Sequence, residues 1–293
     1  MKKLFYSKKI APYVFICPFV LTVLVFWALP ICNGVLLSFQ DVLKDEWIGL
    51  DNYSRLLTDK VFFKAVGNSI RYMIGTLVLL IPFPMLFAVL LNNKKLKGAG
   101  IFKSVYFLPA LTSVVVAGTI FRLMLGESEL SLFNQVLGYL GQAPVKWLKN
   151  GMATYFALLM VACWRWTGVN ILYFLAGLQN IPVELYEAAS IDGASRWQQF
   201  NKISMPLLKP TTVYVLTISI YAGLAMFLES SMLFKGNNSP NNIGLTIVGY
   251  LYRQGIEKRA MGYACAVGII LLLIVMAVNL IQLKVTGTFK GEE

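Results

Sequence analysis

A few ionisable and aromatic side chains stand in or next to apolar stretches of this chain, where they could contact a polar solute. Charged groups within a membrane span cost free energy and usually face a cavity or a partner. Aromatic faces with a few polar groups suit sugar-like rings, whose C–H faces are apolar and whose hydroxyls need hydrogen bonds. The candidates for such a path are Trp164, Arg165, Trp166, Tyr221, Phe227 and Glu229. The competing interpretation is interfacial anchoring, because Trp and Tyr collect at membrane surfaces and arginine can snorkel.

Covalent and metal chemistry are not expected of this chain. The sequence holds no histidine, which removes the commonest metal ligand and general base. Its four cysteines lie inside apolar segments without a C-x-x-C pair, as expected of small buried apolar residues. The phosphate-binding pattern G-x-x-x-x-G-K-[ST] is missing from the sequence as well. We therefore predict no catalytic residue, no metal site and no bound cofactor, so that any ATP-derived energy must come from a partner.

One polar segment, residues 182–206, separates two apolar runs and carries the signals of two short helices. Pro182 suits the first position of a helix, and Glu184 and Glu187 follow where a carboxylate offsets the positive end of the helix dipole. An Asp-Gly pair then breaks the pattern, and Gly193 can adopt the positive φ of a sharp corner. The first helix is predicted to end there.

A second helix is predicted directly after this corner. Ser195 and Gln198 have the spacing of a capping box, which would start the helix. Three apolar residues fall on one face of it, namely Trp197, Phe200 and Ile203. Pro206 is predicted to stop it, since proline breaks a helix interior.

The first helix of this segment has the features of a docking surface. Ala188 and Ala189 are small enough to let another backbone approach closely, and Glu187 offers a charge beside them. The alternative is an amphipathic loop that lies on lipid headgroups.

The composition predicts an integral membrane protein. The mean hydropathy is +0.66, with 57% hydrophobic and only 14% charged residues, whereas about a quarter of the residues in soluble domains are charged. The net charge of +12 does not indicate nucleic-acid binding, because the basic residues lie in loops between apolar runs instead of forming a stripe on one face. The apolar run after the N-terminal lysines is too long for a cleaved signal peptide, so we predict a retained first span.

Uncharged runs long enough for a span of ~20 residues predict an all-α membrane protein with six transmembrane helices. The predicted spans lie within residues 10–40, 72–93, 104–121, 151–183, 210–228 and 260–283, of which the fourth is interrupted by Arg165. Prolines inside them are predicted to kink the helices, with packed neighbours satisfying the freed carbonyl groups.

Lysine and arginine bias predicts which loops face the cytoplasm. With the N-terminus inside, the inner side receives thirteen basic residues and the outer side ten. The short loop 94–103 decides the orientation, because it holds four lysines and no acid, whereas the loop 41–64 holds five acids. Both termini and the segment 182–206 are then predicted to be cytoplasmic.

The polar segment resembles the "EAA" loop of ABC-importer permeases. The match is carried by Glu187-Ala188-Ala189, Gly193, Ile203 and Pro206, with Met205 where the family usually has leucine. Further segments are similar to the carbohydrate branch of the family, the maltose- and glycerol-phosphate-type permeases. They are Trp47-Ile-Gly-Leu-Asp-Asn-Tyr53, Asn92-Asn-Lys-Lys-Leu-Lys-Gly98, Tyr106-Phe-Leu-Pro109 and Leu175-Ala-Gly-Leu-Gln-Asn-Ile-Pro182.

The resemblance implies a type I importer permease fold, with cytoplasmic coupling helices between spans 4 and 5. It also implies a second homologous permease, a cytoplasmic ATPase dimer that uses ATP and Mg, and an extracytoplasmic binding protein that delivers a carbohydrate. The same resemblance places the protein in the cytoplasmic membrane of a prokaryote. The expected division is residues 1–66 for the N-terminus, first span and outer loop, 67–283 for the permease core, and 284–293 for a cytoplasmic tail.

Three alternatives remain open at this point. One is an ion-coupled secondary transporter that uses Arg165 and Glu229 as an intramembrane pair, although such a transporter would have no use for a helix-glycine-helix loop. Another is a membrane anchor without transport activity. The third is a permease of the same type for a polyol or a sugar phosphate, because no motif specifies the solute.

Overall fold

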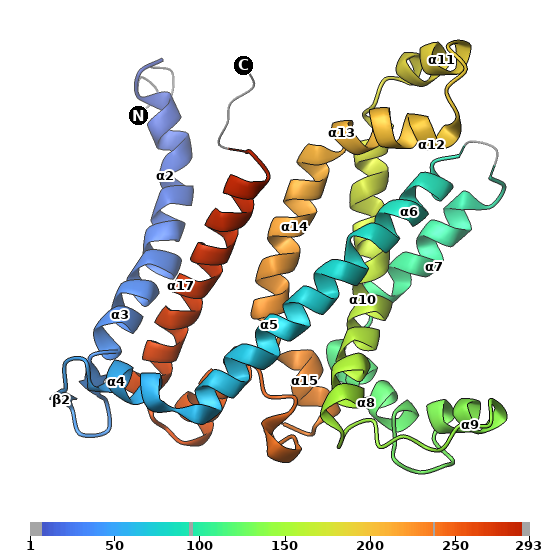
Figure 1. Cartoon of the computed structure of the whole chain (residues 1–293). Coiled ribbons are helices and arrows are strands. Elements are labelled where there is room, and N and C mark those ends of the chain that lie inside the picture. The colour runs from blue at the N-terminus through green and yellow to red at the C-terminus, as the bar shows by residue number, and fades with distance from the viewer. Residues whose placement is uncertain (1–7, 94–95, 237, 289–293) are drawn as a thin grey trace. The chain divides into compact units, whose positions relative to one another are not determined.

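The computed structural model describes residues 8–93, 96–236 and 238–288, and these are almost entirely helical (Figure 1). The chain divides into two compact units, residues 1–59 with 251–272, and residues 60–250 with 273–293. The larger unit holds the segment 182–206 and the candidate solute path.

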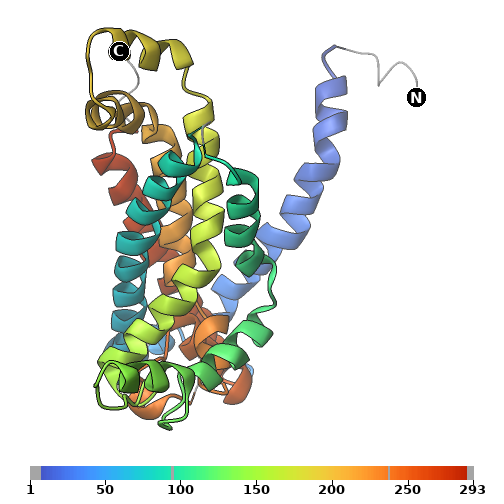
Figure 2. The same cartoon turned by 90° about the vertical axis from the view of Figure 1, so that its right-hand side faces the viewer.

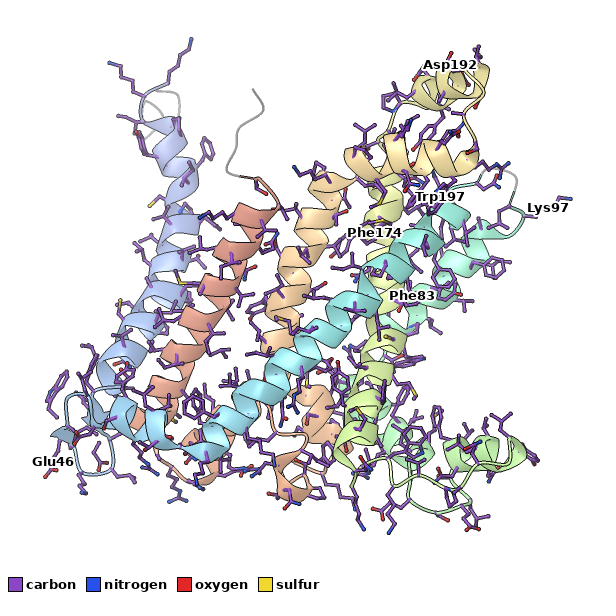
Figure 3. All side chains as sticks on the ribbon, in the orientation of Figure 1. Glu46, Phe83, Lys97, Phe174, Asp192 and Trp197 are labelled. Carbon is purple, nitrogen blue, oxygen red and sulfur yellow. The ribbon has the colours of Figure 1, made fainter. Side chains whose placement is uncertain are left out.

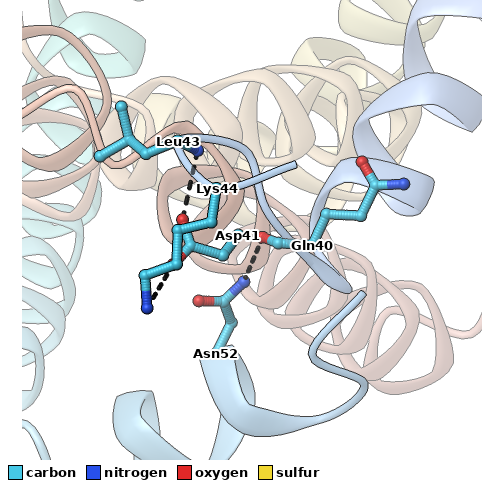
Figure 4. Close-up of polar contacts among 5 residues, drawn as sticks. All are labelled: Gln40, Asp41, Leu43, Lys44 and Asn52. Atoms are coloured by element: carbon cyan, nitrogen blue, oxygen red, sulfur yellow. Dashed lines mark hydrogen bonds and ion pairs between the residues drawn. The ribbon is translucent and has the colours of Figure 1, made fainter. Parts of the chain in front are cut away.

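The smaller unit is built from an N-terminal helix, a short hairpin and the start of the last helix. Its elements are α2 (Ala11–Val23), a π-helical turn (Leu24–Ala28), α3 (Leu29–Leu37), β1 (Gln40–Asp41), β2 (Glu46–Trp47), α4 (Asp51–Thr58), a second π-helical turn (Arg253–Glu257) and the first part of α17 (Met261–Val285). The two strands pair antiparallel, with Gln40 opposite Trp47. The buried Asn52 side chain donates hydrogen bonds to the carbonyl oxygens of Ser38 (2.9 Å) and Gln40 (3.2 Å), which fastens α4 to the hairpin (Figure 4).

The tip of the hairpin is closed by local polar contacts. The Leu43 amide donates to a carboxylate oxygen of Asp41 at 3.2 Å, and the Lys44 ammonium lies 3.8 Å from the other oxygen (Figure 4). The start of α17 approaches this hairpin so closely that a Cβ at Gly262 would overlap the carbonyl oxygen of Gln40. A glycine is therefore required at that position.

The larger unit is a bundle in which α5, α6, α7, α10 and α14 pack along one another (Figures 1 and 2). Its first elements are α5 (Lys60–Leu80), α6 (Pro82–Leu91), α7 (Ala99–Leu111), α8 (Val114–Met124), α9 (Leu132–Tyr139) and α10 (Gly151–Gln179). They are followed by α11 (Val183–Ile191), α12 (Arg196–Gln199), a π-helical turn (Phe200–Ser204), α13 (Met205–Leu207), α14 (Lys209–Leu224), α15 (Leu228–Leu233), a 3-10 turn (Pro240–Asn242) and α16 (Ile247–Tyr252).

Four helices in the described residues are long and apolar enough to cross a membrane, and their positions confirm four of the predicted spans. They are Ala11–Leu37, Lys60–Leu91, Gly151–Gln179 and Met261–Val285. Two bent helix pairs pass the same test, which raises the number to six if each pair is one span. The pairs are Ala99–Leu111 with Val114–Met124, bent by 96°, and Arg196–Leu207 with Lys209–Leu224, bent by 65°.

The predicted span over 104–121 is not one straight helix, because it is covered by two helices that are bent by 96°. The chain leaves the helix at Thr112 and Ser113, whose backbones are extended, and restarts as α8. The two halves have different partners: α7 packs on α10, whereas α8 packs on α15, where Gly118 lies against Met232. The bend follows from these two separate packing surfaces.

At the break between α5 and α6, a side chain makes the hydrogen bond to a backbone carbonyl that a proline cannot make. Pro84 has no N–H to donate to the Leu80 carbonyl four residues earlier. The buried Asn170 side chain of α10 donates to that carbonyl oxygen instead, at 2.7 Å. The expectation that packed neighbours satisfy the freed carbonyls is confirmed at this site.

Candidate functional site

No residue of helix α11 is fully buried, and Tyr186 is the partly buried residue by which it packs against the bundle core. The structure starts it at Val183 and uses Pro182 as the N-cap, so the expectation that Pro182 occupies the first helical position was wrong by one residue. Glu184 lies in the first turn, as expected, and Glu187 and Ala188 are exposed on the helix surface. Figure 3 places Asp192 at the outer end of this element.

The corner after α11 is formed by backbone hydrogen bonds that need a left-handed residue. The Gly193 amide donates to the Ser190 carbonyl at 3.2 Å, and the Ala194 amide donates to the Ala189 carbonyl at 2.8 Å. Gly193 has a φ of +77°, where side chains other than glycine are strained. The predicted glycine corner is confirmed.

The second helix begins with the predicted capping box. Gln198 N donates to Ser195 Oγ at 3.3 Å, and Ser195 N donates to Gln198 Oε1 at 2.7 Å. Pro206, however, does not stop the helix, because a π-helical turn over Phe200–Ser204 leads directly into α13. Only after Leu207 does the chain bend by 65° into α14.

The two short helices are braced against each other by polar side chains. Tyr186 Oη and Ser204 Oγ are 2.8 Å apart, and Gln199 Nε2 donates to Ser190 Oγ at 2.9 Å. A cleft of about 300 Å³ lies between the helices and is lined in part by Ala189. These partners are 18 and 9 residues apart and follow no local sequence pattern, so the sequence interpretation missed them.

The same segment is joined to the bundle core through apolar contacts. Tyr186, Phe200 and Ile203 pack against a buried cluster that includes Phe174 and Leu178 of α10 and residues of α6. A displacement of α11 and α12 would therefore be transmitted to α6 and α10.

Apolar side chains cover the outer surface of the segment. Trp197 is 68% exposed (Figure 3), Ile191 is 87% exposed, and Val183 and Leu185 are exposed as well. Exposed large apolar side chains are typical of a protein-binding surface.

Other chain segments reach the same end of the larger unit. The connection between α6 and α7, which carries Lys97, lies at the end of the bundle that bears α11, whereas α9 lies at the opposite end (Figures 1 and 3). The end of α17 also lies there, because a Cβ at Gly287 would be 3.7 Å from Lys209 Nζ at the start of α14. The segment 182–206 and residues 96–103 of the predicted inner loop 94–103 thus share one end of the larger unit, and residues 94 and 95 lie outside the described residues.

Arg165 and its two tryptophans lie in the middle of α10. The Arg165 guanidinium carbon is 5.4 Å from the centre of the Trp166 ring, and Trp164 packs edge-on against Phe121 at 5.3 Å. Arg165 Nε and Nη1 are buried and have no hydrogen-bond partner among the described residues. Two of the three guanidinium nitrogens are thus buried without a hydrogen bond among the described residues, as expected of a group that binds something outside this chain.

The other three path candidates are divided between two elements. Glu229, on α15, interacts electrostatically with the buried Tyr72 of α5, whereas Tyr221 is 60% exposed on α14. Phe227 is the N-cap of α15. Among the described residues no ion pair joins Arg165 to Glu229, so the structure does not bring these two charges together. Tyr72 was missed, since an aromatic residue in an apolar run is no signal by itself.

Comparisons with known proteins agree on one kind of molecule. The family described as "Binding-protein-dependent transport system inner membrane component" matches residues 81–286. The arabinooligosaccharides transport system permease protein AraP of Bacillus subtilis is 54% identical over 293 residues, which are 99% of this chain and 93% of that protein. The protein of the same description from Halalkalibacterium halodurans is 50% identical over 288 residues, 98% of this chain and 90% of that protein.

Among solved structures, a crystal structure of a bacterial alginate ABC transporter in complex with an alginate pentasaccharide-bound periplasmic protein contains a similar chain. The TM-score is 0.85 at 23% identity, with 96% of this chain and 95% of that chain covered. At this identity the likeness concerns the fold.

Proposed function

The chain belongs to the family of binding-protein-dependent transport system inner membrane components, and on this premise we propose that it is the permease subunit of an importer for arabinose-containing oligosaccharides. The observation that carries the proposal is the 54% identity to an arabinooligosaccharide permease over almost the whole of both chains. The protein is a multi-pass membrane protein of a transport system, and its relatives are transport permeases.

Energy for transport comes in this proposal from a cytoplasmic ATPase dimer, which binds ATP and Mg and grips the segment 182–206. Glu187 supplies the polar anchor, and Ala188 and Ala189 let the ATPase backbone approach. Gly193 provides the corner, while Ile203 and the bend after Pro206 pass the movement to the spans. The exposed apolar surface of α11 and its link to α6 and α10 support these roles.

The proposal also includes the division of the chain, the orientation of its termini and its other partners. The core comprises residues 67–283 with spans 2–6, preceded by the first span and followed by a short tail, and both termini face the cytoplasm. A second homologous permease completes the path, and an extracytoplasmic binding protein delivers the solute. The chain itself binds no cofactor and hydrolyses no ATP, since its sequence holds no phosphate-binding loop. Alternating access then follows from two packed states that ATP binding to the partner biases.

Reconstitution tests the proposal directly. Proteoliposomes that contain this chain, its companion permease and the ATPase are expected to accumulate labelled arabino-oligosaccharide only when both the binding protein and ATP are supplied. Uptake driven by an ion gradient without ATP would establish the secondary-transporter alternative, and no flux under any condition would establish an anchor. Uptake of only a polyol or a sugar phosphate would leave the permease assignment intact and correct the solute.

Arg165 is expected to be required for the passage of solute. Arg165→Met removes a charged group whose Nε and Nη1 atoms are buried without a hydrogen bond among the described residues, so the apparent Tm in detergent should stay or rise. Loss of a charge-assisted hydrogen bond to the solute, about 1.5–3 kcal/mol, corresponds to a roughly 10- to 100-fold lower uptake rate. Uptake assays and thermal unfolding of the same preparation check both results.

Arg122→Met in α8 is the matched control, since Arg122 occupies a helix end where an interfacial anchor is expected. Its uptake should remain near that of the unaltered protein. If uptake by Arg165→Met were as high as uptake by Arg122→Met, Arg165 would also be an interfacial anchor.

A further inference from the structure

Helix α9 presents an apolar stripe to the outside of the larger unit. Leu132, Val136 and Tyr139, together with Leu140 directly after the helix, are exposed, and Tyr139 is 90% exposed. At ~100° per residue these four positions fall within a single arc of about 100°. The neighbouring arc carries Gln135 and Gly138, which are also exposed. The helix therefore has an apolar and a polar side that both face outward.

The third side of α9 is fixed to the bundle, which holds the stripe in one orientation. Phe133 packs edge-on against Trp147 at 5.9 Å, just before α10. The buried Asn134 side chain accepts hydrogen bonds from Trp147 Nε1 and from Val145 N, both at 3.0 Å. Its amide nitrogen donates to the carbonyl oxygens of Gly126, Ser128 and Val145 at 3.1–3.2 Å. These contacts hold the loop around α9 in one defined conformation.

The position of α9 corresponds to a membrane boundary. α10 has 29 residues, about 44 Å at 1.5 Å per residue, whereas the hydrocarbon core of a bilayer is ~30 Å thick. The ends of α10 therefore reach the headgroup region. α9 precedes the start of α10 and runs crosswise to it (Figures 1 and 2). Its axis is then close to the membrane plane.

The charge pattern around α9 favours lipid over a soluble partner. Residues 130–145 form a run of 16 residues without a charge, and charged residues flank it on both sides, with Glu127 and Glu129 before and Lys146 and Lys149 after. Glu127 and Lys149 are themselves ion-paired at 2.8 Å. A docking surface for a soluble protein has a polar rim around its apolar centre. The neighbouring helix α8, which contacts α9, instead exposes further apolar side chains, such as Leu123.

We propose that α9 is an interfacial helix, which lies in the headgroup region with Leu132, Val136, Tyr139 and Leu140 inserted toward the acyl chains. Such helices bury their apolar side about 5–10 Å deep at the boundary of headgroups and chains. Through Asn134 and Trp147, α9 fixes the depth of this end of α10, the end remote from α11. The inference does not depend on the nature of the transported solute.

Site-directed spin labelling of the whole complex in nanodiscs of phosphatidylcholine and phosphatidylglycerol tests this proposal. Single cysteines are introduced as Val136→Cys, Tyr139→Cys and Gln135→Cys, after replacement of Cys17, Cys32, Cys163 and Cys265 by alanine. Nitroxides at 136 and 139 are expected to collide more often with oxygen, which concentrates in the bilayer, than with a water-soluble nickel chelate. The nitroxide at 135 is expected to show the reverse, which makes it the matched control on the same helix.

Two results would overturn the proposal. High accessibility of 136 and 139 to the nickel chelate, as at 135, would place the stripe in water. Low accessibility of 136 and 139 to both reagents would mean that protein covers the stripe, and repetition without the binding protein would distinguish that partner from the companion permease. None of these measurements requires transport, so they remain valid if the proposed function fails.

Discussion

Gly168→Ala is expected to abolish uptake and to destabilise the larger unit. A Cβ at this position of α10 would overlap the carbonyl group of Tyr106 and lie 2.9 Å from the Phe107 nitrogen. Because the obstacle is the backbone of α7, no side-chain rotation relieves it. Overpacking of this kind costs about 1–3 kcal/mol or more, and the two helices must move apart. The contact lies three residues from Arg165, so the candidate solute path would be distorted as well.

Uptake in proteoliposomes and thermal unfolding in detergent check this prediction. We expect uptake below about a tenth of the unaltered level, since 1.4 kcal/mol corresponds to a factor of ten, and an apparent Tm lower by roughly 5 °C or more. Gly67→Ala is the matched control, because Gly67 also lies inside a helix but a Cβ there would meet nothing within 4 Å. That variant should be as stable as the original or slightly more stable, by up to ~1 kcal/mol. Similar behaviour of the two variants would show that the contact of α7 with α10 is not tight.

The sequence was sufficient for the spans whose boundaries depend on hydropathy alone. Apolar runs predicted the first, fourth and sixth spans and the C-terminal end of the second at nearly their final positions, because a helix must cover the hydrocarbon core wherever it packs. The N-terminal end of the second span was placed too late. α5 begins at Lys60 and continues through Lys64 and Arg71, since charged residues do not end a helix that rises above the membrane surface.

The bends could not be predicted, because they depend on which helices meet. The break at Thr112 has no glycine, and the proline next to it, Pro109, lies inside α7 without ending it. In the second bent pair the helix passes through Pro206, because a π-helical turn precedes that residue. Both features follow from tertiary contacts that a single sequence does not display.

In the segment 182–206, too, features that depend on neighbouring residues were predictable, and features that depend on distant residues were not. Its caps and corner were predictable, since Ser195 with Gln198 and the glycine at 193 act within a few residues. The brace between Tyr186 and Ser204 was not, because it joins two helices through side chains 18 residues apart. The same limit applies to Tyr72 beside Glu229, which are far apart in the sequence.

Gly193→Val is expected to weaken the binding of the proposed ATPase partner to the segment 182–206. A β-branched residue at φ +77° is strained by at least roughly 1–2 kcal/mol, so the corner should open and lose the hydrogen bonds from Gly193 N and Ala194 N. α11 would then no longer be held against α12 in one orientation. Co-purification of the ATPase and ATP-dependent uptake should each fall by about tenfold or more, if at least 1.4 kcal/mol of docking free energy is lost. Span insertion should be unaffected, because the corner lies outside the apolar runs.

Gly193→Asn separates backbone conformation from side-chain bulk, because asparagine adopts positive φ far more readily than valine, and a Cβ at 193 meets nothing within 4 Å. This variant should retain most of the ATPase binding.

Glu187→Lys removes the proposed anchor without touching the corner, since the Glu187 side chain is exposed and makes no ion pair within the described residues. It should keep the thermal stability of the original protein and still lose the ATPase. If the valine and lysine variants both bind the ATPase and transport normally, α11 is not the coupling element, and the ATPase must hold another segment at this end of the bundle.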